Sequence, residues 1–248
     1  MEMPSGGTFK EIPLPGPQTI GARCFGVVDL GVVDNTFNPA QPKRDRKVVI
    51  MWELPSLRAV FSEEKGEQPF MVMEELKLSG HADSNFAKLI ANWRNKPLDA
   101  NEQKNFPIEK MINKVCLINI QVKLKKGVTL NPGENPTNKH GYLKMSGIMP
   151  LPADMKGTVP AMMNEPILWL WEDYLKKGVP FDKEKFGKIF KFLRAKIYTS
   201  DDFAQCPGAE NIDIEETQQA AQPQGTAAAP VASSPEPEQP VGGDDGDW

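Results

Sequence analysis

The chain has 248 residues, of which 40% are hydrophobic, so most of its length can build the core of one large or two small domains. Its three cysteines lie far apart and are odd in number, which excludes a disulfide framework and a paired-cysteine zinc site and indicates a reducing compartment. No apolar stretch is long enough to cross a bilayer, and the first residues lack the basic and apolar parts of a secretory signal.

The net charge of −4 conceals two oppositely charged parts. Residues 1–196 contain all 29 Lys and Arg but only 22 Asp and Glu, a net charge of +7. Residues 197–248 contain 11 Asp and Glu and no Lys or Arg, a net charge of −11. The chain is therefore a basic body with an acidic tail rather than a mildly acidic globule.

The first half of the chain predicts strands and then helices. Residues 1–20 are rich in Pro and Gly and are expected to be an extended arm. Apolar, β-branched runs separated by polar or Pro-containing breaks then predict three strands. These runs cover 22–33, 46–55 and 69–80. Apolar residues at helical spacing between Phe86 and Trp93 predict a helix that begins near Asp83 or Ser84, and a second short helix is expected over 107–113.

The second half of the chain begins with the clearest strand signal. Over 114–127, apolar residues alternate with Asn119, Gln121, Lys123 and Lys125. A further strand is expected around 140–152, where Tyr142, Lys144 and Ser146 share one face. Helices are then predicted over 166–178 and 182–197. Beyond about residue 207 the composition is Gln, Ala, Pro, Gly, Ser and acid, which predicts disorder.

This order of elements predicts a mainly β fold with helical additions. We expect a five-stranded Greek-key barrel of the OB type, with a helical insert between the third and fourth strands and C-terminal helices. An ordinary α+β domain is the alternative. The expected parts are an arm at 1–20, a barrel at 21–152 with its insert at 82–113, a helical extension at 153–206 and a disordered acidic tail at 207–248.

Motifs of catalytic and metal sites are missing from the sequence. It contains no GxxxxGK[ST], GxGxxG or GxSxG motif, and His81 and His140 lie far apart without a metal-binding context. The adjacent acid pairs, such as Glu74–Glu75, would point to opposite faces of a strand and make poor acid–base dyads. We therefore expect a protein that is not an enzyme and needs no cofactor or metal, although a nuclease built from distant acids stays open.

Basic residues interleaved with aromatic residues on the predicted strands and loops are the chemistry that remains. Single-stranded nucleic acid is bound by cations that follow the phosphates and by rings that stack on unpaired bases. The candidate residues for binding single-stranded DNA are Arg23, Phe25, Lys43, Arg44, Arg46, Lys47, Lys123, Lys125, Lys126, Lys139, Tyr142 and Lys144.

Each candidate also has a purely structural interpretation. Trp52, with Val48, Ile50 and Leu54 on its face, is expected in the core, as are Trp93, Trp169 and Trp171. Phe25 is balanced between core and surface, and the 43–47 cluster could be a solvated loop. Tyr142 is the strongest aromatic candidate because the residues on its face are polar.

The tail resembles that of the single-stranded DNA-binding proteins of bacteria and phages, which end in acids and an aromatic residue. The matching residues are Asp244, Asp245, Asp247 and Trp248. In that group the tip docks replication and repair enzymes and competes with DNA for the basic groove. The bacterial tip has a proline before a terminal phenylalanine, whereas this chain ends Gly-Asp-Trp and is more similar to phage versions. A solubility tail is the alternative interpretation.

The body is similar to a family of tailed-phage replication proteins. The stretches that carry this resemblance are "KVVIMWELP", "SNFAKLIANWRNKP", "KVCLINI" and "GIMPLP" followed by "NEP", within roughly residues 21–170. The resemblance implies single-stranded DNA binding in phage DNA replication, recombination or repair, in the cytoplasm of an infected bacterium. It also implies polymerase, helicase or primase as partners.

Two other functions stay open at this point: an adaptor between replication or recombination enzymes with little affinity for DNA, and a strand-annealing protein. No membrane partner is expected. The sequence leaves the oligomeric state open, with a homodimer among the options.

Overall fold

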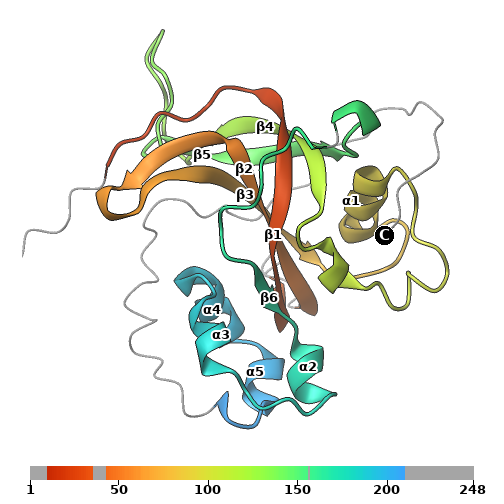
Figure 1. Cartoon of the computed structure of the whole chain (residues 1–248). Helices are drawn as coiled ribbons and strands as arrows, with labels where there is room; N and C mark the ends of the chain where they lie inside the picture. The colour runs from red at the N-terminus through yellow and green to blue at the C-terminus, as the bar shows by residue number, and fades with distance from the viewer. Residues whose placement is uncertain (1–9, 36–42, 156, 210–248) are drawn as a thin grey trace, which may run out of the picture.

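A computed structural model of the chain describes residues 10–35, 43–155 and 157–209 (Figure 1). Its main feature is an antiparallel sheet in the order β3-β2-β1-β4-β5. The two end strands, β3 and β5, lie next to each other, so the sheet curls into a nearly closed five-stranded barrel. The expectation of a mainly β, OB-like fold is confirmed. The strands are β1 (Gln18–Asn35), β2 (Lys43–Ser62), β3 (Gly66–Lys77), β4 (Val115–Leu124) and β5 (Gly141–Met149).

Strand β2, between β3 and β1, is buried on both faces over its middle part, which explains its nearly continuous apolar sequence "VVIMW". Ile50 and Trp52 point into the barrel and are 0% exposed. Val49 and Met51 point outward, into a second hydrophobic core. β1 carries two register shifts, and Gly31 at the second of them adopts a φ of +80°, a conformation that side chains other than glycine disfavour.

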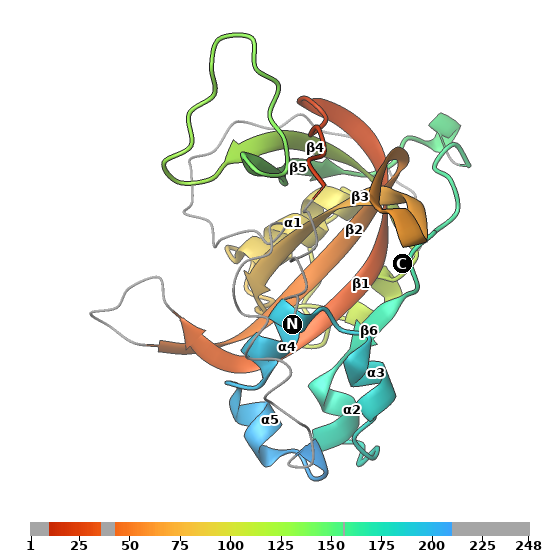
Figure 2. The same cartoon turned by 90° about the vertical axis from the view of Figure 1, so that its left-hand side faces the viewer.

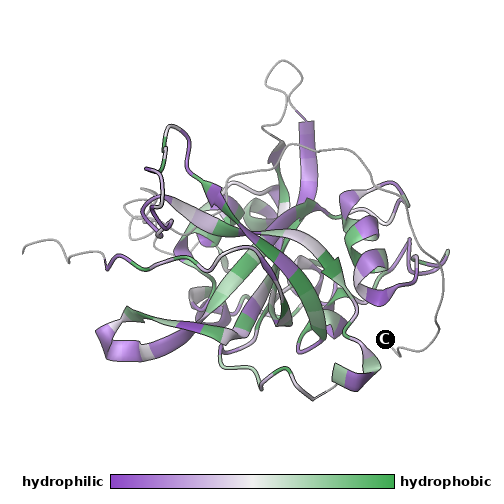
Figure 3. Cartoon of the chain, turned by 90° about the horizontal axis from the view of Figure 1, so that it is seen from above, coloured by the Kyte–Doolittle hydropathy of each residue, from purple (hydrophilic) through white to green (hydrophobic). Residues whose placement is uncertain are grey.

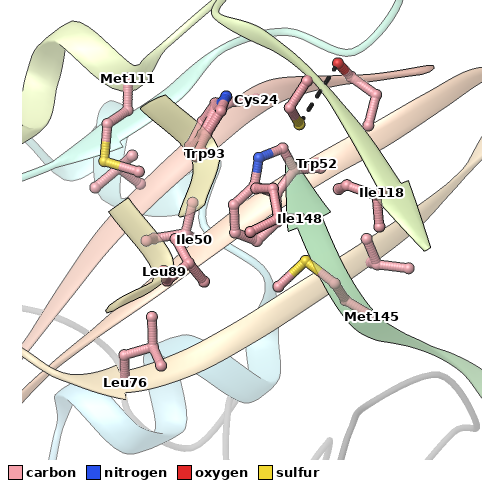
Figure 4. Packing of buried hydrophobic residues seen from close by; sticks show 14 of the residues in the cluster. Cys24, Ile50, Trp52, Leu76, Leu89, Trp93, Met111, Ile118, Met145 and Ile148 are labelled. Atoms are coloured by element: carbon pink, nitrogen blue, oxygen red, sulfur yellow. Dashed lines mark hydrogen bonds between the residues drawn. The ribbon is translucent and has the colours of Figure 1, made fainter. Parts of the chain in front are cut away.

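The helical insert lies between β3 and β4, as predicted, and packs against the barrel core. Helix α1 (Asn85–Arg94) begins after Ser84, whose side chain accepts a hydrogen bond from the Ala87 amide at 3.0 Å. Trp93 of this helix packs on Trp52 with 5.5 Å between ring centroids (Figure 4). Short 3-10 helices occur at η1 (Glu63–Lys65), η2 (Ile108–Met111) and η3 (Ala153–Met155).

The C-terminal extension packs against the outer face of β1 and β2, in the lower part of Figures 1 and 2. It consists of β6 (Ile167–Trp169), α2 (Trp171–Leu175), α3 (Lys183–Gly187), α4 (Lys191–Ile197) and α5 (Asp201–Gln205). Phe25, Trp169, Trp171 and Phe186 are each at most 2% exposed in this second core. Residues 207–209 belong to it as well, because Ala209 is buried.

Two of the expected helices are wrong in detail. The start of 166–178 forms β6, which pairs in parallel with Gly26–Val28 of β1. This pairing satisfies the edge of β1 beyond Arg23, where β4 no longer pairs with it. The single helix expected over 182–197 is broken between α3 and α4, after Gly187, a weak helix former.

Hydrophobic residues concentrate along the barrel strands, whereas the tip of the β2–β3 hairpin and the outer side of α1 are hydrophilic (Figure 3). In the barrel core, burial raises the pKa values of the Cys24 and Cys116 thiols. Both cysteines therefore stay protonated and pack as small apolar residues. Among the described residues, no helix is long and apolar enough to cross a membrane.

Candidate nucleic-acid interface

The outward face of the β4–β5 hairpin carries three of the predicted DNA-binding residues side by side. The strand register places Lys123 opposite Tyr142, and Gln121 opposite Lys144. Residues directly opposite each other on antiparallel strands project from the same face. The neighbouring Leu143 is buried in the barrel. Because side chains alternate along a strand, the polar side chains of this hairpin point outward, as predicted.

The loop between β4 and β5 extends this basic surface. Lys125 Nζ donates to the Asn138 carbonyl at 3.0 Å, and Lys139 forms an ion pair with Glu11. Lys126 is exposed and has no ion-pair partner among the residues described. The loop is held by the N-terminal arm, because the Leu14 amide donates to the Pro136 carbonyl at 2.8 Å. The arm thus packs on the barrel from residue 10 onward.

A carboxylate of β3 lies close to these lysines. Burial raises the pKa of Glu74, while the positive charges of Lys144 and Lys123 act in the opposite direction. This electrostatic interaction links β3 to β5 across the line where the two end strands of the sheet meet. We call this line the seam. Glu74 makes the local charge less positive than the lysines alone would.

An apolar cleft of about 230 Å³ opens along the seam. Phe61 and Phe70, two of its aromatic side chains, meet edge to face with 5.1 Å between centroids. We define the seam surface as this cleft together with the polar β4–β5 face beside it. Its principal residues are Phe61, Gln68, Met71, Met73, Glu74, Gln121, Lys123, Tyr142 and Lys144.

One wall of the cleft is fixed by a buried carboxylate. Glu53 of β2 is 0% exposed and accepts hydrogen bonds from the Met163 and Asn164 amides, both at 2.9 Å. The Asn164 side chain donates a third, at 2.7 Å. Because hydrogen bonds to a charged group are strong, this contact holds the β5–β6 connection against the barrel.

Phe25 is not part of this surface, and the stacking role predicted for it is wrong. Its side chain is 1% exposed within the second core. The ring is covered by the C-terminal extension, so neither of its faces can reach a base. The sequence around Phe25 is apolar on both faces of the strand, which is why it did not distinguish surface from core.

Most of the 43–47 basic cluster forms ion pairs at the C-terminal extension, although the Arg44 side chain stays 42% exposed. Arg46 lies between Asp29, at 3.2 Å, and Asp202. Arg44 pairs with Asp201 at 2.9 Å. These guanidinium groups neutralise carboxylates at the junction with α5, so they do not form a free phosphate-binding track.

Lys47 belongs to the same junction. It pairs with Glu75 at 2.9 Å, and Lys196 of α4 contacts the same carboxylate. Burial favours a raised pKa for Glu75, but Lys196 and Lys47 outweigh it and lower the pKa. The carboxylate is therefore ionised and bridges the barrel to the extension.

The remaining predicted cations lie elsewhere. Arg23 donates to the carbonyls of Pro160 and Val159, both at 3.1 Å, and to Asn113, so it anchors the chain that follows β5. Lys43 is exposed at the start of β2. The C-terminal helices and the β4–β5 loop lie at opposite ends of the molecule in Figures 1 and 2. The predicted set is therefore split, and only its β4–β5 part forms an open surface.

Several residues of the seam surface were not predicted: Phe61, Gln68, Met71, Met73, Glu74, Asn138 and Asn164. The run "PFMVME" is apolar at both odd and even positions, so its pattern does not reveal which side chains reach the surface. The predicted docking residues Asp244, Asp245, Asp247 and Trp248 lie outside the described residues.

No family model, curated protein or solved structure matches this chain. Within the described residues, no group of three or more His, Cys, Asp or Glu could hold a metal ion.

Proposed function

We propose that this protein binds single-stranded DNA, without strong sequence preference and without catalysing a reaction, through the seam surface. The observation that carries the proposal is the cross-strand pair of Lys123 and Tyr142, with Lys144 two residues farther along β5. Cations that hold phosphates beside a ring that stacks on bases are the combination that binding of single strands requires.

The position of this surface on the fold supports the proposal. OB barrels bind oligonucleotides on the face of strands 2 and 3 together with the loops between strands 1 and 2 and between strands 4 and 5. In this chain the outer face of β1 and β2 is covered by the C-terminal extension. The β4–β5 loop, with Lys125, Lys126 and Lys139, lies away from the extension, whereas Met71 and Met73 on the β3 side of the seam pack partly against the second core.

The acidic tail completes the proposed function. Its tip, with Trp248 among Asp residues, would dock replication partners such as a polymerase, helicase or primase. An aromatic anchor flanked by acids suits a pocket ringed by cations. The DNA-binding body and the partner-binding tail would then act in replication, recombination or repair of phage DNA.

A titration of fluorescent oligo-dT with the full chain tests DNA binding. We expect binding at low salt and a steep loss of affinity as the salt concentration rises, because the lysines release counterions from the phosphates. Replacing both Lys123 and Lys144 by Ala should weaken binding about tenfold or more and reduce the slope of log affinity against log salt by about 2.

The matched control replaces Lys88 and Lys110, two exposed lysines of the helical insert, and should bind like the wild type. No binding at low salt would reject the proposal and favour the adaptor function. Incubating labelled DNA with magnesium, or with its complementary strand, separates the other two functions, because cleavage would indicate a nuclease and pairing an annealing protein.

A further inference from the structure

The cleft at the seam has the size for one small ring system. Its volume of about 230 Å³ lies below the roughly 300–1,000 Å³ of pockets for drug-sized ligands. It is lined mainly by apolar side chains of β3 and β5, and it adjoins the Lys123–Tyr142 pair. A bulky cofactor would not fit, but the ring of a single base would.

Some polar side chains that line the cleft already make hydrogen bonds within the described part of the protein, and others do not. The Asn138 side chain is bonded at both its oxygen and its nitrogen, because it accepts from the Ile12 amide and donates to the Lys10 carbonyl, each at 3.0 Å. The Gln68 amide and the Tyr142 hydroxyl, by contrast, have no hydrogen-bond partner within the described part of the chain. These two groups can donate to and accept from a ligand without losing an existing bond.

The apolar walls suit a flat, polarisable ligand. Met71 and Met73 are half-buried and line the cleft beside Phe61. Thioether sulfur makes favourable contacts with aromatic rings, and the unbranched side chain adapts to their shape. Asn164, another lining residue, is held in place by its hydrogen bonds to Glu53, the residue of β2 that pairs with Met71.

We propose that this cleft receives one unpaired base of the bound strand, with the base against Tyr142 and its edge toward Gln68. The inference rests on the proposed function and deepens it. Lys123 stands opposite Tyr142, so a base in the cleft would leave its phosphate near this cation. An apolar side chain of a protein would fill the cleft equally well but would gain nothing from the lysines or from the free amide.

The base pocket gives the protein a physical reason to prefer single strands to duplex. A base in a duplex is stacked and paired, so it can enter a cleft only after the cost of unstacking and unpairing. The lysines alone would not distinguish the two forms, because both carry phosphates.

Two oligonucleotides of equal charge test the proposal with the full chain. One is oligo-dT of about ten nucleotides, within the site sizes of OB folds, and the other has the same phosphates but abasic sugars throughout. We expect the abasic strand to bind at least about fivefold more weakly, because it cannot stack. The Lys123→Ala, Lys144→Ala double variant should weaken both oligonucleotides by a similar factor.

Variants of the cleft locate the base. Tyr142→Leu should lower the affinity for oligo-dT toward that of the abasic strand, while Tyr142→Phe, which keeps the ring, should lose much less. Gln68→Ala should weaken oligo-dT and leave the abasic strand unchanged. A 2-aminopurine base placed within the oligonucleotide should change its fluorescence on binding to the wild type but much less with Tyr142→Leu.

The outcomes separate the two proposals. Equal affinity of the wild type for both oligonucleotides would overturn the base pocket and keep the DNA-binding function. Binding of neither oligonucleotide would reject the proposed function itself. The comparison of oligonucleotides needs only the wild type, so an unstable cleft variant would not obscure it.

Discussion

Glu74 lies at the seam between β3 and the lysines of β4 and β5, where burial makes its ionised form unfavourable. Burial raises the pKa of Glu74, and the attraction of Lys144 and Lys123 does not fully compensate. The folded protein therefore binds a proton at this site more tightly than the unfolded chain does. Ionised Glu74 costs stability at pH values above its ordinary pKa of 4.5.

This cost predicts a pH-dependent effect of Glu74→Gln. The cost is absent below the ordinary pKa, appears as the pH rises through the raised pKa, and is complete above it. The variant should therefore gain stability relative to the wild type as the pH rises above 4.5, the ordinary pKa of this carboxyl group. Urea unfolding at a series of pH values measures the difference, with Glu67→Gln, an exposed acid of the same strand, as the control. A constant difference between Glu74→Gln and the wild type at all pH values would contradict the prediction.

The role of a single residue of the site was predictable only where a local rule determines which way its side chain points. Lys123 and Tyr142 share an outward face because strand alternation and a hairpin place them there, and both features can be read from the sequence. Phe25 and Arg46 also lie on strands, but their surroundings come from residues more than a hundred positions away. No local pattern around either residue indicates that the C-terminal extension covers it.

At the scale of elements, a buried carboxylate contributes to the attachment of α5 to the barrel. Asp202 is 6% exposed, accepts a hydrogen bond from the Val32 amide at 2.7 Å, and pairs with Arg46. Gly31 is required beside it, because a Cβ at this position would lie 2.7 Å from the Asp202 carboxylate. The bulge in β1 and the start of α5 therefore fit each other.

Removing this carboxylate should loosen α5. Asp202→Ala leaves the Val32 amide without its acceptor and Arg46 with Asp29 alone, so we expect a loss of about 3 kcal/mol in unfolding free energy. Thermal or urea unfolding measures it, and hydrogen exchange should show faster opening of α5.

The neighbouring acid of the same helix is the matched control. Asp201 pairs with Arg44, and both side chains are more than 40% exposed, so Asp201→Ala should cost at most about 1 kcal/mol. Equal losses for the two variants would show that burial of Asp202 does not determine the attachment of α5.

The order of the barrel elements was predictable, and the pairing of the extension was not. The sequence shows three segments with the pattern of strands, one with helical periodicity and two more with the pattern of strands. This order is enough to predict an OB-like barrel. Ile167–Trp169 is a short apolar segment that fits a strand or a helix equally well. It forms β6 because β4 leaves the hydrogen-bonding edge of β1 unpaired at Gly26–Val28. Only the tertiary structure determines this, so the local sequence does not show it.

At the scale of the whole molecule, the division of charge connects the seam surface to the tail. Removing residues 210–248 deletes nine acids and no Lys or Arg, and so changes the net charge from −4 to +5. A body without this charge should attract a phosphate backbone more strongly, especially at low salt. The seam lysines would also be free of competition from the acids of the tail.

We therefore expect a chain that ends at Ala209 to bind oligo-dT as tightly as the full chain or more tightly, and to lose capture of purified polymerase, helicase or primase. Truncation at this point keeps Ala209, which is buried in the second core. The Trp248→Ala variant distinguishes the role of the ring from that of the charges, because it keeps every acid of the tail. It should bind DNA like the full chain but lose partner capture. Weaker DNA binding by the truncated chain would show that the tail assists DNA binding instead of competing with the DNA strand. Partner capture that survives Trp248→Ala would show that the acids alone dock the partner.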